Sequence, residues 1–255
     1  MTHFTTAMVK LLRKAGVAAF WILIWYAAYA VVGKSVLLPS PADTARALIS
    51  LVPNASFWLS VLFSLIRIIA GFALGTAAGV VLGALTASFR WARELFSPLV
   101  STVAATPVAS FIILALVWLR VGVIPVFTSF LIVMPVVCSN IAAGINAADS
   151  GLLEMANAFG VGKIKTITGI YIPTVKPYLF AAVSTSVGMA WKAGIAAEVL
   201  CSPVNSIGGK LYDSKIYLDT PSLFAWTVVV VVLSVILGIL IKYLVRRADG
   251  EGSGK

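Results

Sequence analysis

The segment GLLEMANAFGVGKIKTITGIYIP, residues 151–173, lies between two long apolar runs and is too polar to enter a lipid bilayer. Its first part, residues 152–159, has the pattern of a short amphipathic helix. Glu154 falls in the first turns of this helix, where the helix dipole favours a negative charge. Gly160 then supplies a permissive backbone where the chain must turn. We therefore expect residues 149–176 to form a compact connection between two membrane spans.

The second part of this connection predicts another short helical piece. One face of it carries three isoleucines, Ile164, Ile167 and Ile170. Pro173 is expected to break the piece before the next apolar run, because proline lacks a backbone N–H and clashes with the preceding turn. A rigid, partly apolar helix-turn-helix of this kind is suited to a groove on a partner protein.

The composition of the whole chain indicates a membrane protein. Of its 255 residues, 60% are hydrophobic and only 11% are charged, whereas a soluble domain carries about 25% charged residues. A bilayer core needs about 20 apolar residues per helix. Six runs approach or exceed that length: 16–33, 57–86, 98–119, 122–147, 177–200 and 222–245. The predicted fold is all-α, with about six transmembrane helices in one domain, 16–247, and polar tails at 1–15 and 248–255.

The distribution of lysine and arginine predicts the orientation in the membrane. With the N-terminus inside, twelve of these residues fall in cytoplasmic segments and five outside. This bias favours a multi-pass protein of a prokaryotic inner membrane with both termini in the cytoplasm. The first run is longer than the core of a signal peptide, so we interpret it as a retained helix. Outside, residues 42–51 predict a short surface helix, and residues 202–221 form either a helix that meets a partner or a solvated connector.

Several function classes are excluded by residue content. The net charge of +10 comes from short basic clusters between apolar runs, with no basic stripe and interleaved aromatics that would predict nucleic-acid binding. Cys138 and Cys201 have no metal-ligand spacing, and the single histidine is His3. The phosphate-binding pattern G-x-x-x-x-G-K-[ST] is absent. We predict a non-catalytic chain without its own cofactor, metal or nucleotide site.

The second run contains four glycines spaced four residues apart: Gly71, Gly75, Gly79 and Gly83. On a helix they form one smooth ridge, which lets another helix backbone approach closely in lipid. The ridge indicates either a packed seam near a translocation path or ordinary bundle packing.

Three ionisable residues fall inside the predicted spans: Arg67, Lys192 and Glu198. A charge at the centre of a membrane helix costs about 2.5–3.5 kcal/mol on insertion scales, so such residues usually face a bundle interior or water. One hypothesis is that Arg67 or Lys192 attracts an anionic substrate. The other is an internal pair of Glu198 with Arg67 or with Lys192.

The connection between the fourth and fifth spans resembles the signature of binding-protein-dependent ABC importer permeases. That signature runs Glu-Ala-Ala, three residues, Gly, nine residues, then Ile-x-Leu-Pro. The matching residues are Glu154, Ala156, Gly160, Ile170 and Pro173, with Met155 in place of an alanine and Ile172 in place of the leucine. Further stretches look like the taurine, alkanesulfonate, nitrate and thiamine-precursor permeases: 38–41, 64–67 with Gly71, 97–99, 190–191 and 197–198.

The resemblance implies a type I importer fold and a homodimeric permease. It also implies an ATP-binding cassette ATPase dimer, which would bind ATP and magnesium, and an extracytoplasmic solute-binding protein. Alternating access would move a small solute. The loop that would dock into the ATPase comprises Glu154, Met155, Ala156, Ala158, Phe159 and Gly160, with Ile170 and Pro173 completing the signature.

Two other functions remain open at the level of sequence. One is a secondary transporter driven by an ion gradient, which tends to show internal repeats and acidic residues at mid-membrane. The other is a membrane scaffold that recruits a cytoplasmic partner through the Glu154 loop.

Overall fold

The computed structural model of the chain describes the backbone of residues 2–250 and the side chains of residues 16–17 and 19–248. Every regular element among these residues is a helix. The elements are α1 (Thr2–Val32), α2 (Pro41–Leu51), α3 (Ala55–Ser88), α4 (Arg90–Ala105), α5 (Val108–Trp118), α6 (Ile124–Asn146), α7 (Ser150–Ala158), α8 (Lys163–Thr166), the π-helix η1 (Ile167–Tyr171), α9 (Ile172–Cys201), α10 (Ile207–Ile216) and α11 (Thr220–Gly250). The prediction of an all-α protein is confirmed.

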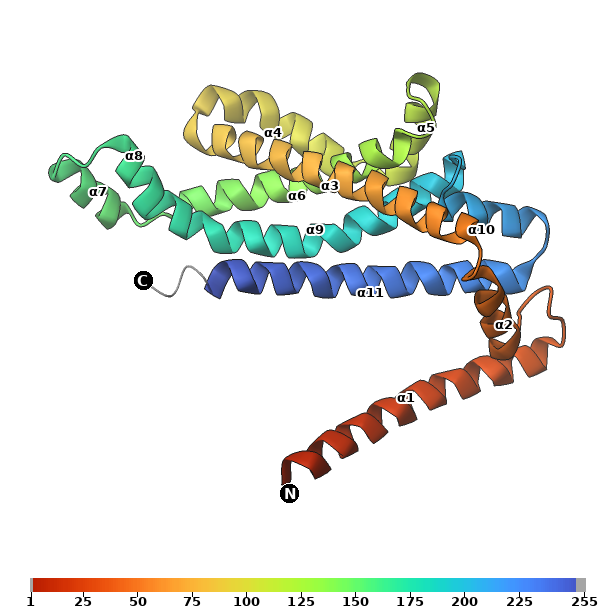
Figure 1. Cartoon of the computed structure of the whole chain (residues 1–255). Helices are drawn as coiled ribbons and strands as arrows, with labels where there is room; N and C mark the ends of the chain where they lie inside the picture. The colour runs from red at the N-terminus through yellow and green to blue at the C-terminus, as the bar shows by residue number, and fades with distance from the viewer. Residues whose placement is uncertain (1, 251–255) are drawn as a thin grey trace.

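Four long helices, α3, α6, α9 and α11, run side by side as the body of the molecule (Figure 1). The α7–α8 hairpin projects beyond one end of this body, and α2 and α10 lie at the other end. The first helix, α1, leaves the body at the α2 end and diverges from it. A partner could therefore contact the projecting hairpin without contacting the four long helices.

The long helices match the predicted spans. Four helical segments with described side chains are long and apolar enough to cross a membrane: Ala55–Ser88, Ile124–Asn146, Lys163–Cys201 and Thr220–Ala248. The pair α4 and α5 makes a fifth span if it is counted as one, and the apolar part of α1, Ala19–Val32, is shorter. The structure therefore supports four of the six predicted spans, or five if α4 and α5 together make one. Helix α1 also continues through the predicted N-terminal tail from Thr2, and α11 continues to Gly250; the rest of the predicted C-terminal tail, residues 251–255, lies outside the described residues.

The predicted run 98–119 is not one straight helix, and Pro107, which predicts a kink within it, is where it breaks. The chain forms α4 and α5 instead, which meet at an angle of 104°. The break falls at Thr106 and Pro107, where Thr106 adopts φ −78° and ψ 132°. Extended backbone is what a following proline favours, because the proline ring crowds the helical conformation of the residue before it.

The predicted break at Pro173 is wrong, because α8, η1 and α9 follow one another without an interruption. Pro173 lies in the first turn of α9, directly after the π-helical turn. Thr174 donates a hydrogen bond from Oγ1 to the carbonyl of Ile170, at 2.8 Å. The π-helical turn changes the winding directly before the proline, and membrane helices tolerate proline where such local adjustments accommodate the missing donor, so the helix continues through Pro173.

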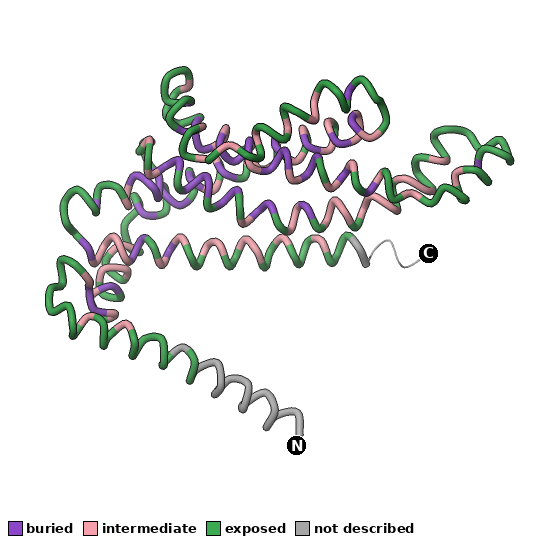
Figure 2. Tube along the Cα trace, turned by 180° about the vertical axis from the view of Figure 1, so that it is seen from behind, coloured by how far each residue is buried: buried purple, intermediate pink, exposed green. Residues whose placement is uncertain are grey.

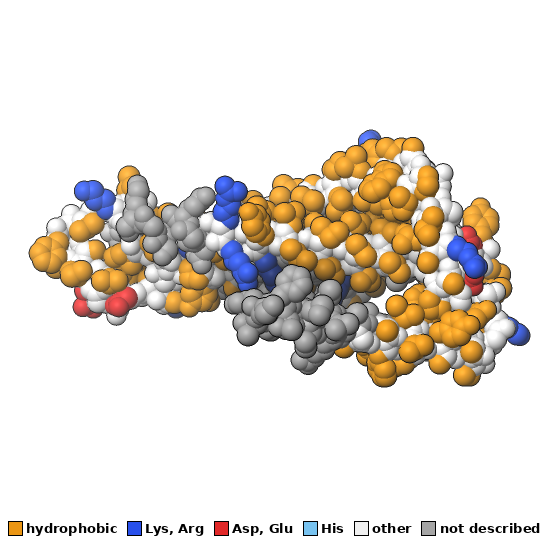
Figure 3. Space-filling model, turned by 60° about the horizontal axis from the view of Figure 1, so that its bottom comes forward, with side chains coloured by type: hydrophobic (Ala, Val, Ile, Leu, Met, Phe, Trp, Pro, Cys, Tyr) orange, Lys and Arg blue, Asp and Glu red, His pale blue; other side chains and the backbone are white. Residues whose placement is uncertain are grey.

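The core lies where α3, α6, α9 and α11 face one another, and buried positions concentrate there (Figure 2). Trp191 is its largest fully buried side chain, and its Nε1 donates to the carbonyl of Val230 at 3.1 Å. Around it pack Phe57, Ile68, Val133, Val137, Ile195 and Trp226. The outer surface is apolar as well: hydrophobic side chains cover much of the face seen in Figure 3. An apolar exterior over an apolar core is expected of a bundle that lies in lipid.

Candidate functional site

The projecting hairpin is built by local capping. The side chain of Asp149 caps α7 by accepting from the N–H groups of Gly151, at 2.7 Å, and Leu152, at 3.3 Å. At the other end Gly160 adopts φ +64°, and the N–H of Val161 donates to the carbonyl of Ala156 at 2.8 Å. A left-handed residue with this six-to-one bond is a common helix stop. The turn predicted at Gly160 is therefore present.

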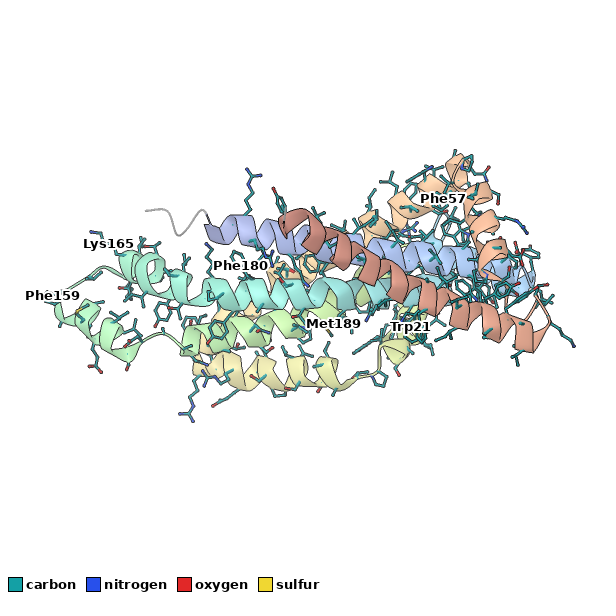
Figure 4. The ribbon with its side chains drawn as sticks, turned by 90° about the horizontal axis from the view of Figure 1, so that it is seen from below. Trp21, Phe57, Phe159, Lys165, Phe180 and Met189 are labelled. Carbon is teal, nitrogen blue, oxygen red and sulfur yellow. The ribbon has the colours of Figure 1, made fainter. Side chains whose placement is uncertain are left out.

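The tip of the hairpin exposes apolar side chains. Phe159 is 80% exposed and Ile164 is 79% exposed, and Met155 on α7 is half exposed. Figure 4 shows Phe159 at the extreme end of the molecule, with Lys165 close by on α8. Large apolar side chains at the end of a projecting element, rimmed by lysines, mark an interaction surface rather than a packed core.

The structure gathers at this tip six of the eight residues predicted for the docking loop. Glu154, Met155, Ala158, Phe159 and Gly160 are exposed, and Ala156 is buried against the hairpin. Ile170 and Pro173 lie farther along the chain, in η1 and the first turn of α9. The first part of the signature therefore forms the surface, and the second part forms the stem that joins it to the bundle.

The four glycines of α3 are buried, and they face α6. A Cβ atom built on Gly75 would lie 2.8 Å from the carbonyl oxygen of Phe130, and one built on Gly79 would lie 2.6 Å from Cβ of Val137. Similar contacts occur along the ridge at Gly71 and Gly83. Real Cβ atoms essentially never come within 3.0 Å of such neighbours, so the two helix backbones touch along a seam that only glycine fits.

A polar network joins α3 and α9 near the end of the bundle opposite the hairpin. Glu198 is fully buried, and its Oε1 lies 3.4 Å from Nη1 of Arg67. Its Oε2 accepts from the hydroxyl of Ser64 at 2.6 Å and from the N–H of Gly208 at 3.2 Å. The carboxylate thus has partners on both oxygens, as a buried charge requires.

Arg67 is held by more than its acidic partner. Its Nη1 and Nη2 also donate to the carbonyls of Asn205, at 3.1 Å, and Val204, at 2.9 Å. These carbonyls belong to the connection between α9 and α10, in which Ser202 and Asn205 have positive φ. The guanidinium therefore lies beside this connection and fastens its unusual backbone to α3.

The structure brings Arg67 and Glu198 together but not Lys192. Lys192 is exposed, and it forms no hydrogen bond or ion pair with any residue the structure describes. Of the two internal pairs considered from the sequence, the one present is Arg67–Glu198.

Sequence reasoning missed the other members of this network. Ser64 lies three residues before Arg67, hence on the same face of α3, and this spacing was a usable signal. No sequence pattern could have indicated the carbonyls of Val204 and Asn205, because every residue carries the same backbone acceptor.

Residues 75–250 match the family described as the binding-protein-dependent transport system inner membrane component. The chain is 28% identical over 218 residues to a probable ABC transporter permease of Brucella melitensis, covering 84% of this chain and 86% of that protein. It is 26% identical over 221 residues to a putative aliphatic sulfonates transport permease of Escherichia coli, covering 85% of this chain and 81% of that one.

The fold also matches solved structures. A chain of a bacterial ABC transporter involved in the import of the acidic polysaccharide alginate superposes with a TM-score of 0.64 at 14% identity, covering 97% of this chain and 99% of that one. Together with the match over residues 75–250, the apolar helices and the projecting hairpin lead to one assignment: the chain belongs to the inner-membrane components of binding-protein-dependent transport systems, the permease subunits of ABC importers.

Proposed function

We propose that this permease moves a small solute, delivered by an extracytoplasmic binding protein, and that a separate ATPase drives the movement through the α7–α8 hairpin. The hairpin carries this proposal. Its tip presents Phe159 and Ile164 almost fully to solvent, and its shape is fixed by the Asp149 cap and the Gly160 turn. A preformed apolar helix end of this kind enters a groove on a partner at little ordering cost.

Energy would come from the partner chain. This sequence has no phosphate-binding loop, so ATP and magnesium would bind to the ATPase dimer. Closure of that dimer would displace the two hairpins of a permease made of two copies of this chain. The cavity between the copies would then open alternately to each side of the membrane, with both termini of each copy in the cytoplasm.

The cargo we propose is a small anion. The relative from Escherichia coli is described as a permease for aliphatic sulfonates, and the sequence resembles the sulfonate and nitrate group. A vitamin precursor is the alternative within the same mechanism.

A transporter driven by an ion gradient is less well supported by the geometry. Such a protein needs an acidic residue free to bind and release a cation at mid-membrane. Glu198 is fully buried and is engaged by Ser64, Arg67 and Gly208. A carboxylate that already has three donors close by is poorly placed for that task.

The test is retention of the candidate ATPase by the tagged permease in detergent. We expect wild type to retain it and Phe159→Asp to lose it, because the variant buries a charge in an apolar contact. Tyr217→Asp is the matched control, since Tyr217 is 81% exposed and follows α10 at the opposite end. A second variant combines Glu154→Lys with Gly160→Pro. Equal retention by all variants would refute the docking role of the hairpin.

A further inference from the structure

Lys192 lies on an exposed stripe along α9. Exposed residues recur on this helix every three or four positions, which places them on one face: Ala181, Thr185, Met189, Lys192 and Ala196. Gly194, two residues after Lys192 and therefore on the other side of the helix, packs against Ile68 of α3 and Ser129 of α6. The stripe thus faces away from the bundle, and Met189 marks its position in Figure 4.

We place Lys192 deep in the membrane from its position along α9, taking the end of that helix as the membrane surface. Nine residues separate it from Cys201, where α9 ends, which corresponds to about 14 Å at 1.5 Å per residue. A membrane core is about 30 Å thick, so this distance approaches its midplane. A lysine at such a depth does not face hydrocarbon; it faces water, an acidic partner or another helix.

Lys192 has no acidic partner among the residues that the structure describes. The described residues give it no ion pair, and the stripe itself contains no Asp or Glu. In a twofold dimer the same patch of both copies forms the contact, so pairing through this stripe would bring no acidic side chain to Lys192, because the stripe contains none. A mobile anion is the complement that this arrangement lacks.

The guanidinium of Arg67 is not available to bind an anion. Its guanidinium is occupied by Glu198 and by the carbonyls of Val204 and Asn205, and its side chain is only 16% exposed. The two basic residues of the predicted spans therefore have different surroundings. Arg67 is bonded to groups of the bundle, whereas Lys192 has no partner among the described residues.

We infer that Lys192 lines the water-filled translocation path and provides the positive charge that selects a small anion. This inference rests on the proposed function and adds to it the residue responsible for the charge of the cargo.

The experiment measures the charge felt at a neighbouring position, so that it does not depend on knowing the cargo. Cys138 and Cys201 are first replaced by alanine, and Ala196→Cys is introduced one helical turn from Lys192. The permease, assembled with its ATPase in nanodiscs, is treated with two membrane-impermeant thiol reagents. One is the anionic sulfonatoethyl methanethiosulfonate, and the other is the cationic trimethylammonioethyl methanethiosulfonate.

We expect both reagents to modify Ala196→Cys, the anionic one preferentially. Adding Lys192→Met should slow the anionic reagent about threefold and speed the cationic one about threefold, as expected for a unit charge about 6 Å away in water. The ratio of the two rates then falls about tenfold. Lys192→Arg should keep the wild-type ratio, and Lys192→Gln replaces Lys192→Met if that variant does not assemble. Val235→Cys on α11, an exposed residue in an uncharged apolar run, should remain unmodified.

Two results would overturn the inference. If Ala196→Cys reacts with neither reagent, the stripe is not exposed to water and does not line a water-filled path. If it reacts but the rate ratio does not depend on Lys192, the lysine does not set the charge of the path. Retention of the ATPase is measured on the same samples, so a failure of Lys192 is distinguished from a failure of the transporter assignment.

Discussion

The seam between α3 and α6 gives a quantitative prediction for Gly79→Ala. The added Cβ would lie 2.6 Å from Cβ of Val137 and 2.8 Å from the carbonyl oxygen of Met134. Ordinary contact begins near 3.4 Å, so the helices must separate by several tenths of an ångström or more. Overpacking of this kind costs about 1–3 kcal/mol, and alanine returns about 0.5–1 kcal/mol through its better helix propensity. The net expected loss of stability is about 1–2 kcal/mol.

This loss is measurable as a shift in apparent melting temperature. For a chain of this size about 1 kcal/mol corresponds to about 2–4 °C, so Gly79→Ala should melt about 2–8 °C below wild type. The melting temperature is measured in detergent by heating samples and quantifying the remaining folded protein by size-exclusion chromatography. Gly238→Ala on α11 is the matched control, because a Cβ there meets no atom within 4 Å. We expect it to melt at or slightly above the wild-type temperature. If Gly79→Ala melts as high as Gly238→Ala, the backbones do not touch and the reasoning about the seam is refuted.

Three further predictions concern single features of the bundle. Glu198→Ala leaves the guanidinium of Arg67 without its acidic partner and should destabilise the protein by about 3–5 kcal/mol. This loss is seen as aggregation in size-exclusion chromatography. Replacement of both residues by methionine should recover most of the lost stability, and no recovery would contradict the pairing. Gly160→Val forces a β-branched residue into φ +64° and should destabilise the turn locally by about 1–2 kcal/mol. We expect faster amide hydrogen exchange in α7 and an unchanged melting temperature. An unchanged exchange rate would argue against a strained turn. Trp191→Phe removes the donor to the carbonyl of Val230 and should lower the melting temperature by about 2–4 °C, as one buried hydrogen bond contributes about 1 kcal/mol; an unaltered value would mean that water or another donor replaces the indole.

The sequence predicted most of the fold because apolar length is a local property. Runs of about 20 apolar residues identify membrane helices whatever surrounds them. The two places where the helices differ most from the predicted runs both lie at prolines. Pro107 separates two helices at 104°, whereas Pro173 lies inside a continuous rod. The difference lies in the local winding, which in the second case changes to the π-helical turn η1 directly before the proline. A local rule about proline does not contain that information.

The candidate site was predictable in part for a similar reason. The spacing of Glu154 and Gly160 specifies a helix and its stop, and both are formed by contacts within a few residues. The partner of Glu198 was not specified, because Arg67 is 131 residues away in the chain. The choice between Arg67 and Lys192 depends on how α9 is rotated about its axis. That rotation is set by packing against α3 and α6, which no short motif encodes.

The uninterrupted passage from α8 through η1 into α9 has a mechanical consequence. The segment Lys163–Cys201 has 39 residues, about 58 Å measured along the helix at 1.5 Å per residue, and it begins beside Phe159. We propose that it carries a displacement of the hairpin toward the far end of α9. In a straight rod of this length, a tilt of about 5° would move the far end by about 5 Å, roughly one helical turn. The far end is bonded through Glu198 to Ser64 and Gly208, so the displacement would reach α10. Along the described segment the winding changes at the π-turn η1, and the stiffness of that turn would set how much of the displacement arrives.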